Sequence, residues 1–168
     1  YGRNGSCVAI DRKRFGPAMY KRYKEMRDSL DYIVVIGGHN DASLLDSIGI
    51  DNYKAKLAVL CEGLRERYPA ARIVFFTRWT CKDFAGSASE QVVDATLEVC
   101  GRYDIPVFDA ARQSNIAAED DAFRALYFQN GGRNDTAHLN NAGHDLFLPV
   151  AEDFLLKAAH SATTVGSI

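Results

Sequence analysis

The chain has 168 residues, of which 47% are hydrophobic and 25% are charged, a composition typical of one globular domain with a buried core. Its net charge of -2 gives no electrostatic reason to expect a nucleic acid or an anionic membrane surface as partner. No segment approaches the ~20 consecutive apolar residues that a membrane-spanning helix requires. We therefore expect neither a nucleic-acid partner nor a transmembrane segment.

The first half of the sequence predicts two helices, each followed by a strand. Pro17 to Leu30 has a proline in its first turn and charges along one face, which indicates a helix. Residues 32–36 are a continuous apolar run before two glycines, typical of a strand buried on both faces. Apolar residues recur at three and four positions over 51–68 and predict a helix that Pro69 ends. Residues 72–77 predict a second buried strand.

A third helix and a third strand follow. The helix is expected over residues 87–103, with Ser87 or Ser89 as its N-cap. The strand is short and covers residues 105–109.

The last third of the chain is less regular. Residues 110–141 are rich in Asp, Asn and Gly, and within them only 120–127 predicts a helix. A final helix is expected over 142–159, where Pro149 predicts a kink or a break. We expect residues 161–168 to form a tail beyond a single domain of residues 1–160.

Strands that alternate with helices predict an α/β fold, in which a parallel sheet lies between helices on both faces. Ligands of such sheets bind beyond the carboxyl ends of the strands. The segments that follow each strand are therefore the place to look for chemistry.

The four cysteines do not decide the compartment of the protein. They show no CxxC pair and no zinc-type spacing with histidine. Cys61 and Cys100 lie in helical patterns beside apolar residues, which predicts buried free thiols. A bridge between Cys7 and Cys81 stays open as an alternative, and the localisation stays open with it.

Two segments after strands carry candidate catalytic side chains. Residues 37–41 read Gly-Gly-His-Asn-Asp, where the glycines allow a tight turn and Asn40 directs an amide into a pocket, although a plain strand-ending turn has the same composition. Asp135 and His138 are three residues apart, so the carboxylate can orient the imidazole as a general base. The alternative is a turn capped by Asp135 with His138 as an ordinary polar residue.

A third segment lies at the start of the chain. Residues 2–5 read Gly-Arg-Asn-Gly, a pattern that by itself indicates only a turn. The backbone N–H of Gly5 is a candidate donor to an oxyanion.

Taken in order, these segments resemble the SGNH (GDSL-type) hydrolase family across nearly the whole chain. Residues 1–5 look like its second sequence block, 38–41 like its third and 135–138 like its fifth. The resemblance implies a three-layer α/β/α sandwich with a flavodoxin-like parallel sheet. It also implies His138 and Asp135 as members of a catalytic triad, with Gly5 and Asn40 as oxyanion donors.

The first block of that family, a strand that ends in Gly-Asp-Ser, is absent from these 168 residues. The resemblance implies that it precedes Tyr1 by roughly 25–40 residues at ordinary element lengths, in the same or another chain. A local substitute is the alternative, either Ser6 beside the oxyanion glycine or the tail at residues 163–168 as a remnant of a permuted block. Ser6 would have to serve two geometries at once, and the tail lacks the aspartate.

The resulting hypothesis is a serine ester hydrolase (a GDSL-type esterase or acetylesterase) that acts on small acyl esters, including O-acetylated carbohydrate. No metal or organic cofactor is implied. His39, Trp79 and Arg133 are candidate substrate-binding residues, and Asp41 is expected to brace the Asn40 loop. The alternative, which the missing serine supports, is a non-catalytic carbohydrate- or partner-binding module on a degenerate hydrolase scaffold.

Overall fold

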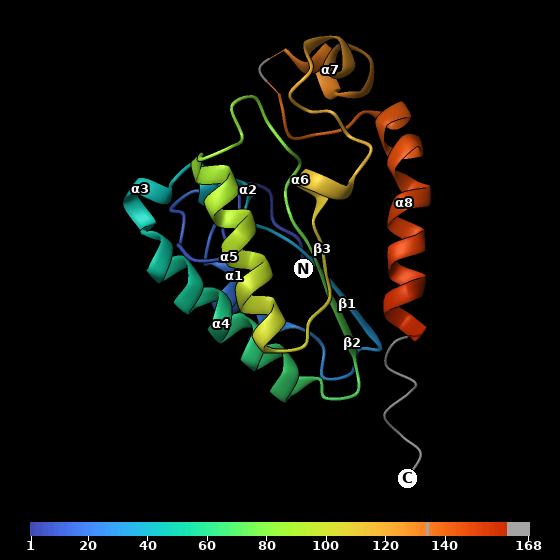
Figure 1. Ribbon diagram of the computed structural model, residues 1–168. Coiled ribbons are helices and arrows are strands. Elements are labelled where there is room, and N and C mark those ends of the chain that lie inside the picture. The colour runs from blue at the N-terminus through green and yellow to red at the C-terminus, as the bar shows by residue number, and fades with distance from the viewer. Residues whose placement is uncertain (134, 161–168) are drawn as a thin grey trace.

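A computed structural model describes residues 1–133 and 135–160, apart from the side chain of His160. A parallel sheet in the order β1-β2-β3 forms its centre, with β1 at Tyr32–Ile36, β2 at Arg72–Phe76 and β3 at Val107–Phe108. Figure 1 shows α4 and α5 on one side of this sheet and α8 on the other. The predicted three-layer α/β/α architecture is confirmed. The tail predicted at 161–168 lies outside the described residues.

The layer of α4 (Ile50–Arg67) and α5 (Ala88–Arg102) holds most of the core. The apolar repeat of the α4 region is confirmed, because its buried positions include Tyr53, Leu57, Leu60, Cys61 and Leu64. Ser87 is the N-cap of α5, since its hydroxyl accepts a hydrogen bond from the Glu90 N–H at 3.2 Å.

The last helix, α8, runs over Asn141–His160 on the opposite face of the sheet. Asn140 caps it by accepting from the Gly143 N–H at 3.0 Å, and Phe154 stacks edge-on against Phe76 of β2 at 5.1 Å between ring centroids. Of the kink or break predicted at Pro149, the break is wrong, since α8 continues through this residue. Aromatic and aliphatic side chains on both sides of the proline pack on the sheet.

Short helices connect these elements. They are α1 (Met19–Arg22), η1 (Tyr23–Glu25), α2 (His39–Ala42), α3 (Leu45–Ile48), α6 (Ala110–Gln113), α7 (Asp121–Tyr127) and η2 (Gln129–Gly132). In the described part of the chain, no helix has the length and apolar character needed to cross a membrane.

The helix predicted over residues 17–30 is much too long, because α1 and η1 end at Glu25 and Met26 is extended. Hydrogen bonds to distant residues explain the difference. The buried guanidinium of Arg22 donates to the carbonyl of Tyr1 at 2.8 Å, and the hydroxyl of Tyr68 donates to the carbonyl of Arg27 at 2.6 Å. These contacts fix the backbone after residue 25 in a course that no local periodicity encodes.

The strand predicted at residues 105–109 is also shorter than expected. The N–H of Ile105 bonds back to the carbonyl of Cys100 at 3.0 Å, so this residue still belongs to the turn after α5. Pro106 has no N–H to donate to the ladder, which leaves Val107–Phe108 as the paired part.

Strand β1 is buried on one face only, so the prediction that residues 32–36 are buried on both faces is wrong. Ile33 is 5% exposed, whereas Val34 is 46% and Ile36 is 69% exposed. Alternate side chains of a strand point to opposite faces, and α8 packs on β2 and β3 without covering β1. The hydroxyl of Tyr32 donates to the carbonyl of Leu155 at 3.1 Å and ties the start of the strand to the end of α8.

All four cysteines are free, so the Cys7–Cys81 bridge is not formed. Cys61 and Cys100 are buried thiols, as predicted. Their sulfur atoms are 3.8 Å apart, well beyond the length of a disulfide bond, which is ~2.05 Å.

Candidate active site

A cavity of about 710 Å³ lies at the carboxyl ends of β1 and β2, where the fold predicts ligand binding. Its walls come from segments far apart in sequence: the N-terminal segment with Gly5, the β1–α2 turn with Asn40, the loop after β2 with Trp79, and the loop before α8 with His138. The structure therefore brings the candidate residues from the three sequence blocks to one cavity.

The Asp135–His138 pair has the geometry of an oriented imidazole. Nδ1 of His138 lies 3.0 Å from each carboxylate oxygen of Asp135. The same carboxylate accepts from the backbone N–H groups of Ala137 and His138, both at 3.0 Å. Burial alone would raise the pKa of Asp135, but these hydrogen bonds outweigh it and lower the pKa below its ordinary value. The carboxylate stays ionised, and Nε2 of the ring is left for another partner.

Gly5 presents an N–H group that has no acceptor within the described residues. Its backbone has φ +66°, and an added Cβ would lie 2.7 Å from the ring of Phe15, so glycine is required on both counts. Its carbonyl accepts from Arg12 at 2.9 Å, which fixes the peptide orientation.

Asn40 lies in the first turn of α2, two residues after Gly38, whose backbone is in the left-handed region at φ +94°. One N–H group of the Asn40 side-chain amide donates to the carbonyl of Ser6 at 3.0 Å. The second N–H of the amide is available to a ligand in the cavity that Asn40 lines.

Asp41 braces this part of the site, as predicted. It is fully buried, and its two carboxylate oxygens accept from the N–H groups of Val8 and Ala9 at 2.8 and 2.9 Å. Burial raises its pKa despite these hydrogen bonds. The two hydrogen bonds to Asp41, together with the Asn40–Ser6 bond, join α2 to the N-terminal segment as one unit.

Of the three candidate substrate-binding residues, two line the cavity. His39 is half-buried, and burial, followed by the nearby charges of Arg78 and His138, lowers its pKa to about 4. Trp79 is held by a hydrogen bond from its indole N–H to the carbonyl of Ala137 at 3.1 Å. Arg133 is exposed and does not line the cavity. The binding roles of all three stay predictions.

Two hydroxyl side chains line the cavity, and both are engaged elsewhere. The Ser6 hydroxyl accepts from Arg22 at 2.6 Å and is buried, which argues against the alternative that it replaces the nucleophile. The Thr77 hydroxyl accepts from the N–H of Ala110 at 2.8 Å.

Sequence reasoning missed Arg78, which lines the same cavity. The signal was present, since Arg78 is the first charged residue after β2 and the carboxyl ends of strands were already the expected place for ligand contacts.

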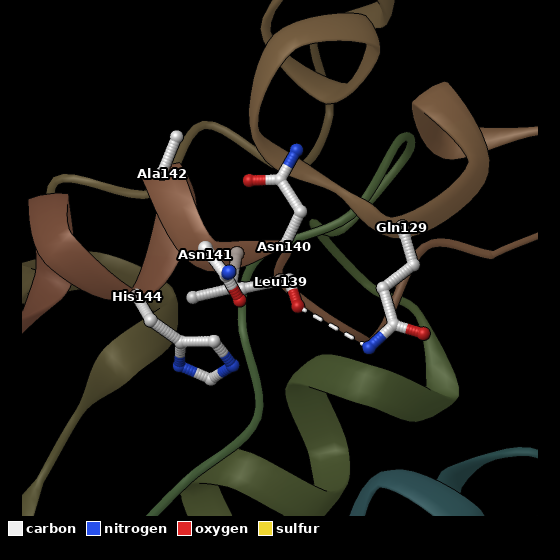
Figure 2. Close-up of a pocket in the computed structure, with 6 residues that line it drawn as sticks. All are labelled: Gln129, Leu139, Asn140, Asn141, Ala142 and His144. Carbon is white, nitrogen blue, oxygen red and sulfur yellow. Dashed lines mark hydrogen bonds between the residues drawn. The ribbon is translucent and has the colours of Figure 1, made fainter.

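A second hollow of about 540 Å³ shares part of its wall with the cavity, and Figure 2 shows the residues that line it. Gln129, Leu139 and His144 line both spaces. The side-chain amide of Gln129 donates to the carbonyl of Leu139 at 3.4 Å, as Figure 2 shows. The polar side chains of this hollow extend the cavity outward along the start of α8.

A carboxylate-oriented histidine at the carboxyl edge of a parallel sheet, in a three-layer α/β/α fold, is an arrangement that hydrolases use, among other classes of protein. Comparison with known families makes the class specific. The model of the GDSL-like lipase/acylhydrolase family matches residues 1–146, and the chain belongs to this family.

Solved structures agree with the fold. A protein from Lactobacillus plantarum is 25% identical, with a TM-score of 0.75 over 91% of this chain and 77% of its own. Another crystal structure is 28% identical, with a TM-score of 0.72 over 91% of this chain and 76% of its own. A Bacteroides ovatus protein described as a GDSL-like lipase is 17% identical, with a TM-score of 0.60 over 91% and 68%, and shows the fold alone. Among proteins with curated functions, none matches this chain.

Proposed function

We propose that the protein is a serine ester hydrolase that acts on small acyl esters, including O-acetylated carbohydrate. The observation that carries the proposal is the Asp135–His138 pair, which faces the same cavity as the Gly5 N–H and the Asn40 amide. Family membership supports hydrolase chemistry at the general level.

In the proposed reaction, a serine hydroxyl attacks the ester carbonyl while Nε2 of His138 takes its proton. Asp135 stabilises the imidazolium that forms. The negative charge on the former carbonyl oxygen is held by the Gly5 N–H and the free N–H of Asn40. Collapse of the tetrahedral intermediate breaks the bond to the alcohol, which leaves with the proton from His138. Water, deprotonated by the same imidazole, then releases the acid and restores the serine.

The serine is proposed to come from a segment outside these 168 residues, in the same or another chain. The hydroxyls that line the cavity are engaged by Arg22 and Ala110, so neither is free to attack. The uncovered face of β1 supports a place for such a segment. Val34 and Ile36 are exposed there and line the cavity that holds His138, so residues of this segment can cover them. β1 is also an edge strand of the described sheet, so a further strand of the segment can pair with its free edge and end near the imidazole.

The test adds a serine-reactive fluorophosphonate to the natively purified protein and locates the adduct by peptide mass spectrometry. We expect one labelled serine, hydrolysis of 4-nitrophenyl acetate, and loss of both in His138→Ala. No adduct and no hydrolysis at any concentration would overturn the proposal. That outcome would favour the non-catalytic binding module instead.

A further inference from the structure

Arg78 is a half-buried arginine whose charge is poorly compensated by the protein. It follows β2 and lines the cavity beside His39 and His138. Within the described residues the only hydrogen bond of its side chain runs from Nε to the carbonyl of Trp79 at 3.3 Å. No carboxylate in that part of the chain lies within ion-pair distance of it.

Other arginines show that this fold normally supplies partners for such charges. Arg112 pairs with Asp109, Asp94 and Glu90. The other arginine of the cavity, Arg3, pairs with Glu25 at 3.2 Å.

Buried Arg22 has no carboxylate partner, but it donates to two backbone carbonyls and the Ser6 hydroxyl. Within the described residues the guanidinium of Arg78 has no carboxylate partner and only the one long hydrogen bond to Trp79. A half-buried guanidinium with this little compensation favours a bound anion as its partner.

The surroundings of Arg78 fit an anion that belongs to a larger polar molecule. Burial and the neighbouring cations lower the pKa of His39 to about 4, so at neutral pH its ring is an uncharged donor or acceptor. The nearest carboxylate of the site, Asp135, is occupied by His138 and two backbone N–H groups. The Trp79 ring is fixed edge-on against Phe147 at 4.8 Å between centroids and gives a flat apolar wall.

We propose that Arg78, assisted by His39, is an anion subsite, and that the favoured ester carries a carboxylate or phosphate group near the acyl bond. The claim about the favoured ester rests on the proposed function, whereas the claim that Arg78 binds an anion does not. A planar guanidinium suits both anions, because its forked N–H groups match two oxygens of either one.

The binding test uses the fluorescence of Trp79, the one tryptophan of the chain, which adjoins Arg78. D-glucuronate and inorganic phosphate are titrated separately, with D-glucose as the neutral control. We expect a saturable change with at least one anion and none with glucose, and the better ligand identifies the group. Arg78→Gln should weaken this binding by about tenfold or more, and Arg78→Lys by less, since lysine keeps the charge but loses the fork.

Arg102→Gln is the matched control. This substitution removes the same charge, but Arg102 lies on α5 and outside the cavity lining. Its binding should stay within about twofold of the parent, as expected for a distant surface charge in physiological salt. Thermal unfolding of each variant checks that the fold is kept. Equal binding by the parent and Arg78→Gln, or an equal loss in Arg102→Gln, would overturn the subsite.

A second measurement separates the subsite from the proposed function. The kcat/KM values of the natively purified protein are compared for O-acetylated glucuronate and O-acetylated glucose. Arg78→Gln should lower kcat/KM for the acidic ester by about tenfold or more and change the neutral ester little. Anion binding through Arg78 without any hydrolysis would overturn the function and leave the subsite. Equal hydrolysis of both esters by parent and variant would overturn the subsite and leave the function.

Discussion

The two faces of β1 place two different environments on one strand. Ile33 is 5% exposed and faces the layer where Tyr53 and Leu57 are fully buried. Ile36, three residues further, is 69% exposed and lines the cavity. Packing and candidate chemistry are thus divided between the two faces of this strand. Changes on the packed side should act on stability, and changes on the open side should act on catalysis and binding.

The largest effect is expected on the open side, at His138. His138→Ala should lower kcat by roughly 10³–10⁴-fold, about 4–5.5 kcal/mol of transition-state stabilisation, because the general base is lost. The melting temperature should hardly change, since this side chain is 62% exposed. His144→Ala, at the same rim but without a carboxylate partner in the described chain, should cost less than about tenfold. Similar losses in the two variants would contradict the assignment.

On the packed side, Leu57→Ala should reduce the free energy of unfolding by about 2–5 kcal/mol, because it opens a cavity in a fully buried site. The kcat per folded molecule should stay the same. Val59→Ala on the same helix is the control, since Val59 is 42% exposed and should change stability by less than about 0.5 kcal/mol. Urea unfolding measures both. If both substitutions lowered the free energy of unfolding equally, the distinction between the buried and the exposed side of α4 would not hold.

His39 links stability to pH from within the cavity. Its pKa is about 4 in the folded protein against 6.5 when unperturbed, mainly because of burial and then because of Arg78 and His138, with Asp135 opposing. The unfolded chain therefore binds more protons between these values. The contribution is fully present above pH 6.5 and is lost as pH falls towards 4, by about 1–3 kcal/mol after allowance for solvent screening.

Urea unfolding at pH 7.5 and pH 4.5 tests this sign. Carboxylates also titrate in that range, so the comparison is with His39→Gln, in which the loss of stability on acidification should be smaller by the same amount. An unchanged pH dependence in the variant would show that His39 does not carry it.

The smallest effect on stability is expected at Ile36 when these 168 residues are studied without the serine-bearing segment. Ile36→Ala should cost less than about 0.5 kcal/mol, whereas Ile33→Ala on the same strand should cost about 2–4 kcal/mol. With a serine-bearing segment over the open face, the cost at Ile36 should rise to about 1 kcal/mol or more, since its side chain would then be buried. Calorimetry on both forms measures the difference. No increase would argue against a segment at this face.

The sequence predicts those elements best whose signals are local. The bounds of α4 and α5 follow from the spacing of Leu57, Leu60 and Leu64, from Pro69 and from the Ser87 cap. The features that were predicted wrongly depend on contacts between residues far apart in sequence. Arg22 bonds to Tyr1 beyond the reach of periodicity, and a run of apolar residues cannot tell whether a helix covers its second face.

The residues of the candidate site also differ in whether a local sequence pattern predicts them. Gly5, Asn40, Asp135 and His138 stand in short patterns whose residue types suit a strand end or a helix start. Gly5, Asn40 and His138 line one cavity, and Asp135 is hydrogen-bonded to His138. Arg78 stands in no such pattern, because its proposed role rests on the lack of a carboxylate partner among the described residues. The absence of a partner is a property of three-dimensional structure, so single-sequence reasoning does not detect it.

The hydrogen bond from Tyr32 to Leu155 spans 123 residues of sequence, whereas the β1–β2 pairing joins residues about forty apart. Contacts between distant residues form late, since a longer loop must be closed first. α8, and the Asp135–His138 loop directly before it, are therefore expected to dock after β1, β2 and α4 have packed. On a ribosome the imidazole would take its place only once α8 had emerged. Pulse-labelled hydrogen exchange would show this as protection of β2 amides before those of α8.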